Sequence, residues 1–312
     1  MLKSAGRFIL YVMKFPFPKQ FKSISDLVSL LTGRGLIIND IPKAEKYLVN
    51  IGYFRLSAYF FPLLKLPKTD HLYKAGSTFE QVLNLYRFDK KLRLLIFNEI
   101  EKIEIAIRSI MVNTACQHFN DVFWITQSQY FYNQDYFNSS ITEIDSELNK
   151  SKEDFIEHFK NTYSDTYPPA WMIIEVLPLG NICRIYKNLN DNKLKKRIAG
   201  QFGLQPQAFE SWIMTIGGLR NVCCHHNRLW NRSFPLRVLL PQSTRFLWLN
   251  NPSSIDVQRL YYRLCMIRYL LSSVSPTNTF KNKLVDLLDK YPCVDIRAMG
   301  FTDDWLSEPL WK

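Results

Sequence analysis

The sequence is poor in glycine and has no long apolar run. Eleven glycines in 312 residues exclude collagen-like and low-complexity classes, and 47% hydrophobic residues exclude a disordered chain. The longest apolar stretches, 56–64 and 171–183, fall short of the roughly 20 residues that a transmembrane helix needs. We therefore expect a packed body and no membrane span.

Acidic residues are also few, and the cysteines show no regular spacing. Twenty-eight acidic residues face forty basic ones, and the net charge of +12 suits an acidic partner such as nucleic acid or an anionic lipid surface. Six irregularly spaced cysteines favour free thiols in a reducing compartment. Lys14 interrupts the apolar run near the start and no small-residue cleavage site follows, so we expect a cytoplasmic protein. Peripheral membrane binding by the basic segment 1–22 stays an alternative.

Helical periodicity and helix capping signals predict an all-α fold. Asp40, with Pro42 in the first turn, predicts a helix that ends near Gly52, and Thr78 with Gln81 opens a long helix that runs to about residue 116. Further helices are expected at 25–33, 53–64, 171–189 with a kink at Pro178 and Gly180, 209–230 with a bend at Gly217 and Gly218, and 254–274.

The expected organisation has four parts with soft boundaries. A basic N-terminal segment, 1–22, precedes a helical subdomain at 23–70. The core covers 75–275, and a helical extension covers 276–312. Residues 117–167 are expected to hold loops and weaker helices with an acidic surface patch.

The sharpest anomaly of composition lies between residues 211 and 270. This stretch holds eight arginines, no lysine and one acidic residue, Asp256. The planar guanidinium binds phosphate through two hydrogen bonds, so the bias favours phosphate recognition. Seven of the aromatic residues interleaved here either stack on bases or belong to the core: Trp212, Trp230, Phe234, Phe246, Trp248, Tyr261 and Tyr262.

The densest run of chemically capable side chains is 220–228, which contains Arg220, Asn221, His225 and His226. Asn221 and His225 are one helical turn apart, so the amide can orient the imidazole, and Arg228 and Arg232 would extend that face. Arg220 lies about 140° around an ideal helix from His225. Both reach one phosphate only if the helix is distorted at the glycine pair or if a second copy completes the site, which predicts a homodimer.

Two alternatives concern the cysteines of the same run. A zinc site at Cys223, Cys224, His225 and His226 is disfavoured, because four successive helical residues point in four directions. A nucleophilic Cys224 is disfavoured because sequence neighbours on a helix do not face each other. No metal or other cofactor is expected.

The segment from Leu219 to Arg232 resembles the signature of Abi-like proteins of the AbiD/AbiF group, which belong to the HEPN superfamily. Further blocks occur in the same order and are similar to those of the group: 52–59, 88–93, 103–109, and 169–171 with Glu175 and Gly180. The resemblance covers the chain from about residue 22 to its end.

The resemblance implies an abortive infection protein of bacterial anti-phage defence and a HEPN helical fold that dimerises with two R-x4-6-H motifs at the interface. It also implies an endoribonuclease toxin that needs no metal: the ribose 2′-hydroxyl attacks its own phosphodiester and leaves a 2′,3′-cyclic phosphate. His225 would be the general acid/base, Arg220 would stabilise the phosphorane, and Asn221 would orient either the imidazole or the phosphate.

A structured small noncoding RNA is a further partner that the resemblance implies, and no membrane partner is expected. Supporting or RNA-binding roles are expected for His226, Asn227, Arg228, Arg232, Glu104, Arg108, Lys195, Lys196 and Arg197. Glu104 and Arg108 form an i,i+4 ion pair on the long helix, and Lys195 to Arg197 form a basic cluster. The alternative is a HEPN protein that binds RNA or a partner without catalysis.

Overall fold

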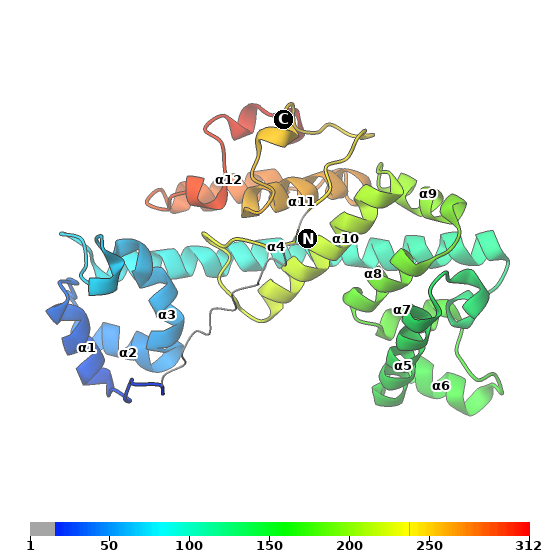
Figure 1. Ribbon diagram of the computed structural model, residues 1–312, viewed down its shortest axis with the longest axis horizontal. Coiled ribbons are helices and arrows are strands. Elements are labelled where there is room, and N and C mark those ends of the chain that lie inside the picture. The colour runs from blue at the N-terminus through cyan, green and yellow to red at the C-terminus, as the bar shows by residue number, and fades with distance from the viewer. Residues whose placement is uncertain (1–15, 237) are drawn as a thin grey trace, which may run out of the picture. The chain divides into compact units, whose positions relative to one another are not determined.

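A computed structural model describes residues 16–236 and 238–312 (Figure 1). Twelve α-helices and eight short 3₁₀ helices lie in this part of the chain, which contains isolated β-bridges but no strand. The all-α prediction is confirmed. Most of the basic segment 1–22 and Arg237 lie outside the described residues. Within the described ranges, no helix combines the length and apolarity required to cross a bilayer.

The chain divides into two compact units, 1–83 and 84–312, while the finer boundaries expected from the sequence stay a prediction. Described helices of the first unit are α1 (Ile24–Gly33), α2 (Ile41–Ile51), α3 (Tyr53–Phe60) and the first turn of α4 (Phe79–Phe119). Local capping begins α2 and α4, as predicted. The Asp40 carboxylate accepts the Lys43 amide at 2.9 Å, and Thr78 and Gln81 form the reciprocal capping box.

Helix α4 continues through the second unit, where one of its faces is apolar. Its fully buried apolar residues recur every three or four positions: Phe88, Leu92, Ile96, Ile100, Ile103, Ile107, Met111 and Ala115. The other helices of this unit are α5 (Gln134–Lys150), α6 (Asp154–Thr162), α7 (Ala170–Val176), α8 (Leu179–Asn188), α9 (Asn192–Gln201), α10 (Pro206–Cys224), α11 (Leu260–Val274) and α12 (Phe280–Lys290). Three short 3₁₀ turns follow α12: Arg297–Met299, Trp305–Ser307 and Pro309–Trp311.

The core of the second unit surrounds α11. Nearly every residue of α11 from Leu260 to Leu271 is buried, and all of these residues except Arg263 and Arg268 are apolar or aromatic. Helix α10 packs against α8, α9 and α11, so the segment with the candidate motif starts from a rigid support (Figure 1).

Three sequence predictions about helix bounds are corrected. Pro178 breaks the expected helix 171–189 into α7 and α8, because proline has no amide hydrogen to donate. The Leu177 carbonyl at the break accepts a hydrogen bond from the buried Arg108 instead. Helix α10 passes through Gly217 and Gly218 without a break and ends at Cys224, six residues early. Helix α11 begins at Leu260, after a 3₁₀ turn at Pro252–Ser254.

The aromatic residues of the arginine-rich stretch belong to the core. Of the seven named above, Phe246 is partly exposed. The other six are buried: Trp212, Trp230, Phe234, Trp248, Tyr261 and Tyr262. The base-stacking interpretation is therefore wrong for these six. Arg263 is also buried, with its guanidinium 4.1 Å from the centroid of the Phe234 ring and a hydrogen bond to the Val257 carbonyl.

Candidate functional site

The candidate motif lies at the C-terminal end of α10, and its helix stop differs from the sequence prediction. His225 is the C-cap residue rather than part of the helix. The His226 amide donates to the Cys223 carbonyl and the Asn227 amide to the Val222 carbonyl, each at 3.0 Å. This pair of bonds is a Schellman motif, which satisfies the last helix carbonyls and turns the chain away from the axis.

His226 occupies the position of the Schellman motif where glycine is usual. Its φ of +54° lies in the left-handed region, which costs a residue with a Cβ about 1–2 kcal/mol. Since no glycine marks this turn, the sequence pattern alone did not reveal it. The face predicted to continue from Asn221 and His225 through Arg228 and Arg232 therefore does not exist as a helix face.

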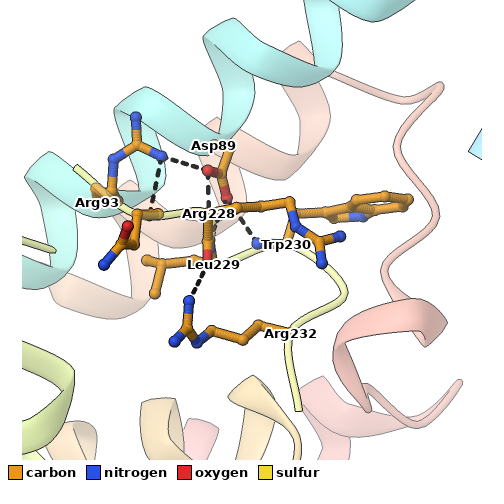
Figure 2. A network of polar contacts seen from close by, with 7 residues as sticks. Asp89, Arg93, Arg228, Leu229, Trp230 and Arg232 are labelled. Carbon is orange, nitrogen blue, oxygen red and sulfur yellow. Dashed lines mark hydrogen bonds and ion pairs between the residues drawn. The ribbon is translucent and has the colours of Figure 1, made fainter. Parts of the chain in front are cut away.

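A buried carboxylate on α4 holds the chain just after this turn, as Figure 2 shows. Asp89 is fully buried, and its carboxylate accepts the Leu229 amide at 3.0 Å and the Trp230 amide at 2.6 Å. Arg93, one turn along α4, forms an ion pair with Asp89 and donates to the Asn227 carbonyl at 3.3 Å. Asp89 and Arg93 thus fix residues 227–230, a role that the sequence analysis missed because only tertiary structure brings α4 to this segment.

The side chains of the turn are open to solvent. Asn221, His225, His226 and Asn227 are exposed, and Arg228 is half-buried. Between Asn221 and His225 the structure has a backbone hydrogen bond of 3.0 Å, and no side-chain hydrogen bond of His225 occurs within the described ranges. The His225 imidazole is thus free to meet a ligand, while its backbone is held on both sides.

Arg220 faces α4 and lies beside the ion pair predicted there. The Glu104 carboxylate lies 2.5 Å from Arg108 Nη2 and 3.6 Å from Arg220 Nε. Arg108 is buried, and its guanidinium also donates to the Leu177 carbonyl at 2.9 Å. Glu104 is therefore anchored by Arg108 and directs its second oxygen toward Arg220, whose Nε makes no hydrogen bond with any described residue.

A cavity of about 220 Å³ opens at this cluster, with Arg220, Glu104, Arg108, Phe97, Ile105, Glu101 and Glu175 in its wall. The structure thus brings Glu104 and Arg108 to Arg220, as the supporting role requires. On a regular α10, Arg220 and His225 project about 140° apart.

The basic cluster of α9 lies apart from the motif. Lys195 donates to the Lys187 carbonyl at 2.6 Å, Arg197 donates to Gln117 at 2.9 Å, and Lys196 is exposed. Within the described ranges, no hydrogen bond or ion pair joins these three residues to residues 220–232. Partial burial lowers the pKa of Lys195.

Cys223 of the motif does not form a prepared thiolate. Cys223 is buried, and burial raises the pKa of its thiol to about 12, so the thiol is protonated at neutral pH. In the part of the chain that the structure describes, no three His, Cys, Asp or Glu side chains gather as metal ligands.

Comparison with known proteins identifies the family through this region. The family model described as Abi-like protein matches residues 46–231, more than half of the chain. The chain belongs to the Abi-like family. The match includes α4 and all of α10 with its turn, so Asp89, Arg220 and His225 lie in the part of the chain that defines membership. No curated protein and no solved structure matches the chain. Membership of the Abi-like family supports a role in abortive infection, the form of anti-phage defence that gives the family its name.

Proposed function

We propose that this Abi-like protein is an endoribonuclease toxin that cleaves RNA without a metal. The observation that carries the proposal is an exposed histidine on a turn that Asp89 holds in place, on the same helix end as Arg220. The segment from Arg220 to His225 resembles the R-x4-6-H motif of HEPN proteins, and this resemblance supplies the reaction class.

In the proposed reaction, the ribose 2′-oxygen forms a bond to the adjacent phosphorus while the bond to the 5′-oxygen breaks. The 2′-hydroxyl loses its proton and the leaving 5′-oxygen gains one, which gives a 2′,3′-cyclic phosphate and a 5′-hydroxyl. His225 moves a proton as general acid or base, since imidazole titrates near neutral pH. Arg220 stabilises the additional negative charge of the phosphorane, and Asn221 orients the phosphate.

The geometry supports a site shared between two copies of the chain. Helix α10 continues without a break through Gly217 and Gly218, so it lends no support to a distortion at that pair. Exposed apolar side chains lie along α4 beside the Arg220 cavity: Leu94, Phe97 and Ile105 are 61%, 37% and 59% exposed. Such a stripe next to a functional group suits association with a second copy.

The first experiment compares RNA cleavage in EDTA by wild type, His225→Ala and Arg220→Ala, with His158→Ala as the matched control. His158 is also exposed but lies on α6, where its imidazole contacts Thr162. We expect cyclic-phosphate ends from wild type and the control, and loss of cleavage by at least about a hundredfold in His225→Ala. Cleavage by His225→Ala at the wild-type rate contradicts the assignment.

Mixing the two inactive variants tests the shared site. If Arg220 of one copy acts with His225 of the other, a mixed dimer of Arg220→Ala and His225→Ala contains one complete site and regains cleavage. If both residues act within one copy, the mixture stays inactive. Ile105→Asp places a charge in the apolar stripe and should shift the protein toward monomer in analytical ultracentrifugation.

A second candidate function is RNA binding or partner binding without cleavage. The specific observation in its favour is the ion pair between Arg220 and Glu104, because it gives the motif arginine a structural role as well. A pure binder shows a steep salt dependence of RNA affinity and no cleavage product. Association with a small noncoding RNA fits either candidate, and sequencing of RNA that copurifies with the protein tests it.

A further inference from the structure

A second cavity of the large unit, of about 450 Å³, lies away from the motif. The loop between α10 and α11 contributes Arg245, Phe246 and Leu247 to its wall, and α11 contributes Arg268 and Ser272. The last 3₁₀ turn and the residue after it close the cavity with Pro309, Leu310 and Lys312. Neither the resemblance nor the proposed reaction uses these residues.

The charged side chains of this cavity are all basic. Arg245, Arg268 and Lys312 line it, and among the described residues no Asp or Glu does. By contrast, three other cavities contain two or more carboxylates each: the one at the Arg220 cluster, one between α5 and α7, and one at the start of α4. The cavity of Arg245 and Arg268 is therefore suited to an anion.

Arg268 forms no ion pair with any residue that the structure describes. Its side chain is half-buried, its Nε is shielded from solvent, and this atom has no hydrogen-bond partner among the described residues. Burial also lowers the pKa of Arg268, because the charged form loses hydration without gaining a carboxylate. A bound anion would supply the missing acceptor.

The backbone of Arg245 is fixed before any ligand binds. Its amide lies 3.2 Å from the Gly203 carbonyl and 3.1 Å from the Tyr269 hydroxyl, and that hydroxyl donates to Gly203 at 2.7 Å. Gly203 has a φ of +68°, and a Cβ on it would lie 2.8 Å from the Cβ of Arg245. The loop can therefore approach α11 closely only because residue 203 is glycine.

We propose that Arg245 and Arg268 bind a phosphate group of a ribonucleotide, with the ammonium group of Lys312 as a further cation in the wall. The guanidinium forks match phosphate oxygens, while Phe246 and the exposed Leu247 offer apolar surface to the adjoining ribose and base. This inference deepens the proposed function, since it gives RNA a binding site outside the cleavage motif. The phosphate comes from either an RNA strand or a free mononucleotide.

The experiment measures binding rather than cleavage, so that the two proposals can fail separately. A fluorescein-labelled single-stranded RNA of ten nucleotides is titrated by anisotropy in EDTA against protein that carries His225→Ala. Arg245→Gln and Arg268→Gln are compared with Arg297→Gln. The control removes the same charge from an arginine that is 74% exposed and paired with Asp303 outside the cavity.

We expect each cavity variant to bind RNA about tenfold more weakly than the parent protein, or weaker still, and the control to bind with the affinity of the parent. The slope of log affinity against log salt should fall in magnitude by about 0.7 for each phosphate that the variant no longer neutralises. Adenosine, which has no phosphate, should not displace the RNA. If adenosine monophosphate displaces the RNA, the source of the phosphate is a free nucleotide, and if only oligonucleotides displace it, the source is a strand.

Two outcomes overturn the proposal: both cavity variants bind RNA within twofold of Arg297→Gln, or adenosine displaces RNA as well as its monophosphate does. Thermal unfolding checks that each variant is folded. Because the Arg245 side chain is exposed, Arg245→Gln carries the test even if Arg268→Gln does not fold.

Discussion

The buried carboxylate of Asp89 offers the most direct test of how the candidate site is held. Its substitution by alanine removes the partner of Arg93, whose side chain is 6% exposed, and leaves the Leu229 and Trp230 amides without an acceptor. Removing one partner of a buried ion pair destabilises a protein by about 3–5 kcal/mol. For a unit as large as residues 84–312, the melting temperature should fall by about 6–20 °C.

The coupling between the two charges decides whether this reasoning holds. Asp89→Ala, Arg93→Ala and the double variant are unfolded in urea, with Lys90→Ala as an exposed control on the same helix. The double variant should lose less than the sum of the single losses, by about 1–3 kcal/mol, because it contains no unpaired buried charge. If the losses of unfolding free energy in the two single variants add up to that of the double variant within about 0.5 kcal/mol, Asp89 and Arg93 do not act as a pair.

A second measurement separates positioning from general stability. At a temperature where Asp89→Ala is still folded, the amide hydrogens of Leu229 and Trp230 should exchange faster than those of α11, since only the former lose their acceptor. RNA cleavage should fall under the same conditions, because the turn next to His225 is no longer fixed. Uniform acceleration of exchange would indicate a structural role alone.

Three further predictions rest on local geometry. His226→Gly should raise the unfolding free energy by up to about 1 kcal/mol and His226→Val should lower it by about 1–2 kcal/mol in urea titrations, because φ is positive there. Burial raises the pKa of Cys183 and Cys223 to about 12, so both thiols keep their protons when the unfolded chain has lost them. Stability should therefore fall as pH rises from about 9 to 12, by up to about 1.4 kcal/mol per thiol and pH unit, and urea unfolding of Cys→Ala variants at pH 8 and 10 checks this. Gly203→Ala should cost more than about 1 kcal/mol in the same titration and displace Arg245.

Arg220 has two roles to separate, as a ligand of phosphate and as the partner of Glu104 in an ion pair. Arg220 is close to a carboxylate that Arg108 already partly neutralises, so Arg220 is oriented without a full counter-charge. Glu104→Gln separates the two roles, since it removes the charge and keeps the shape. If Arg220 acts on phosphate, this variant should retain cleavage, and its loss would show that the Glu104 charge is needed to place the guanidinium.

The sequence by itself determined the elements whose ends are set by neighbours along the chain. Asp40 and Thr78 begin α2 and α4 as predicted, because an N-cap side chain binds amides two or three residues ahead. The all-α class also followed, since helical periodicity is a local property. The long α4 was predictable because residues 79–116 contain neither glycine nor proline.

Tertiary structure alone decided where α10 stops and what its neighbours do. No local signal marks the end at Cys224, and the turn is completed by Asp89, more than a hundred residues earlier in the sequence. The glycines at 217 and 218 did not interrupt the helix, because packing against α8, α9 and α11 outweighs their weak helix propensity. The sequence could not predict that the interleaved aromatic residues are buried, because a core and a base-stacking surface use the same residue types. The two differ only in what packs against these residues.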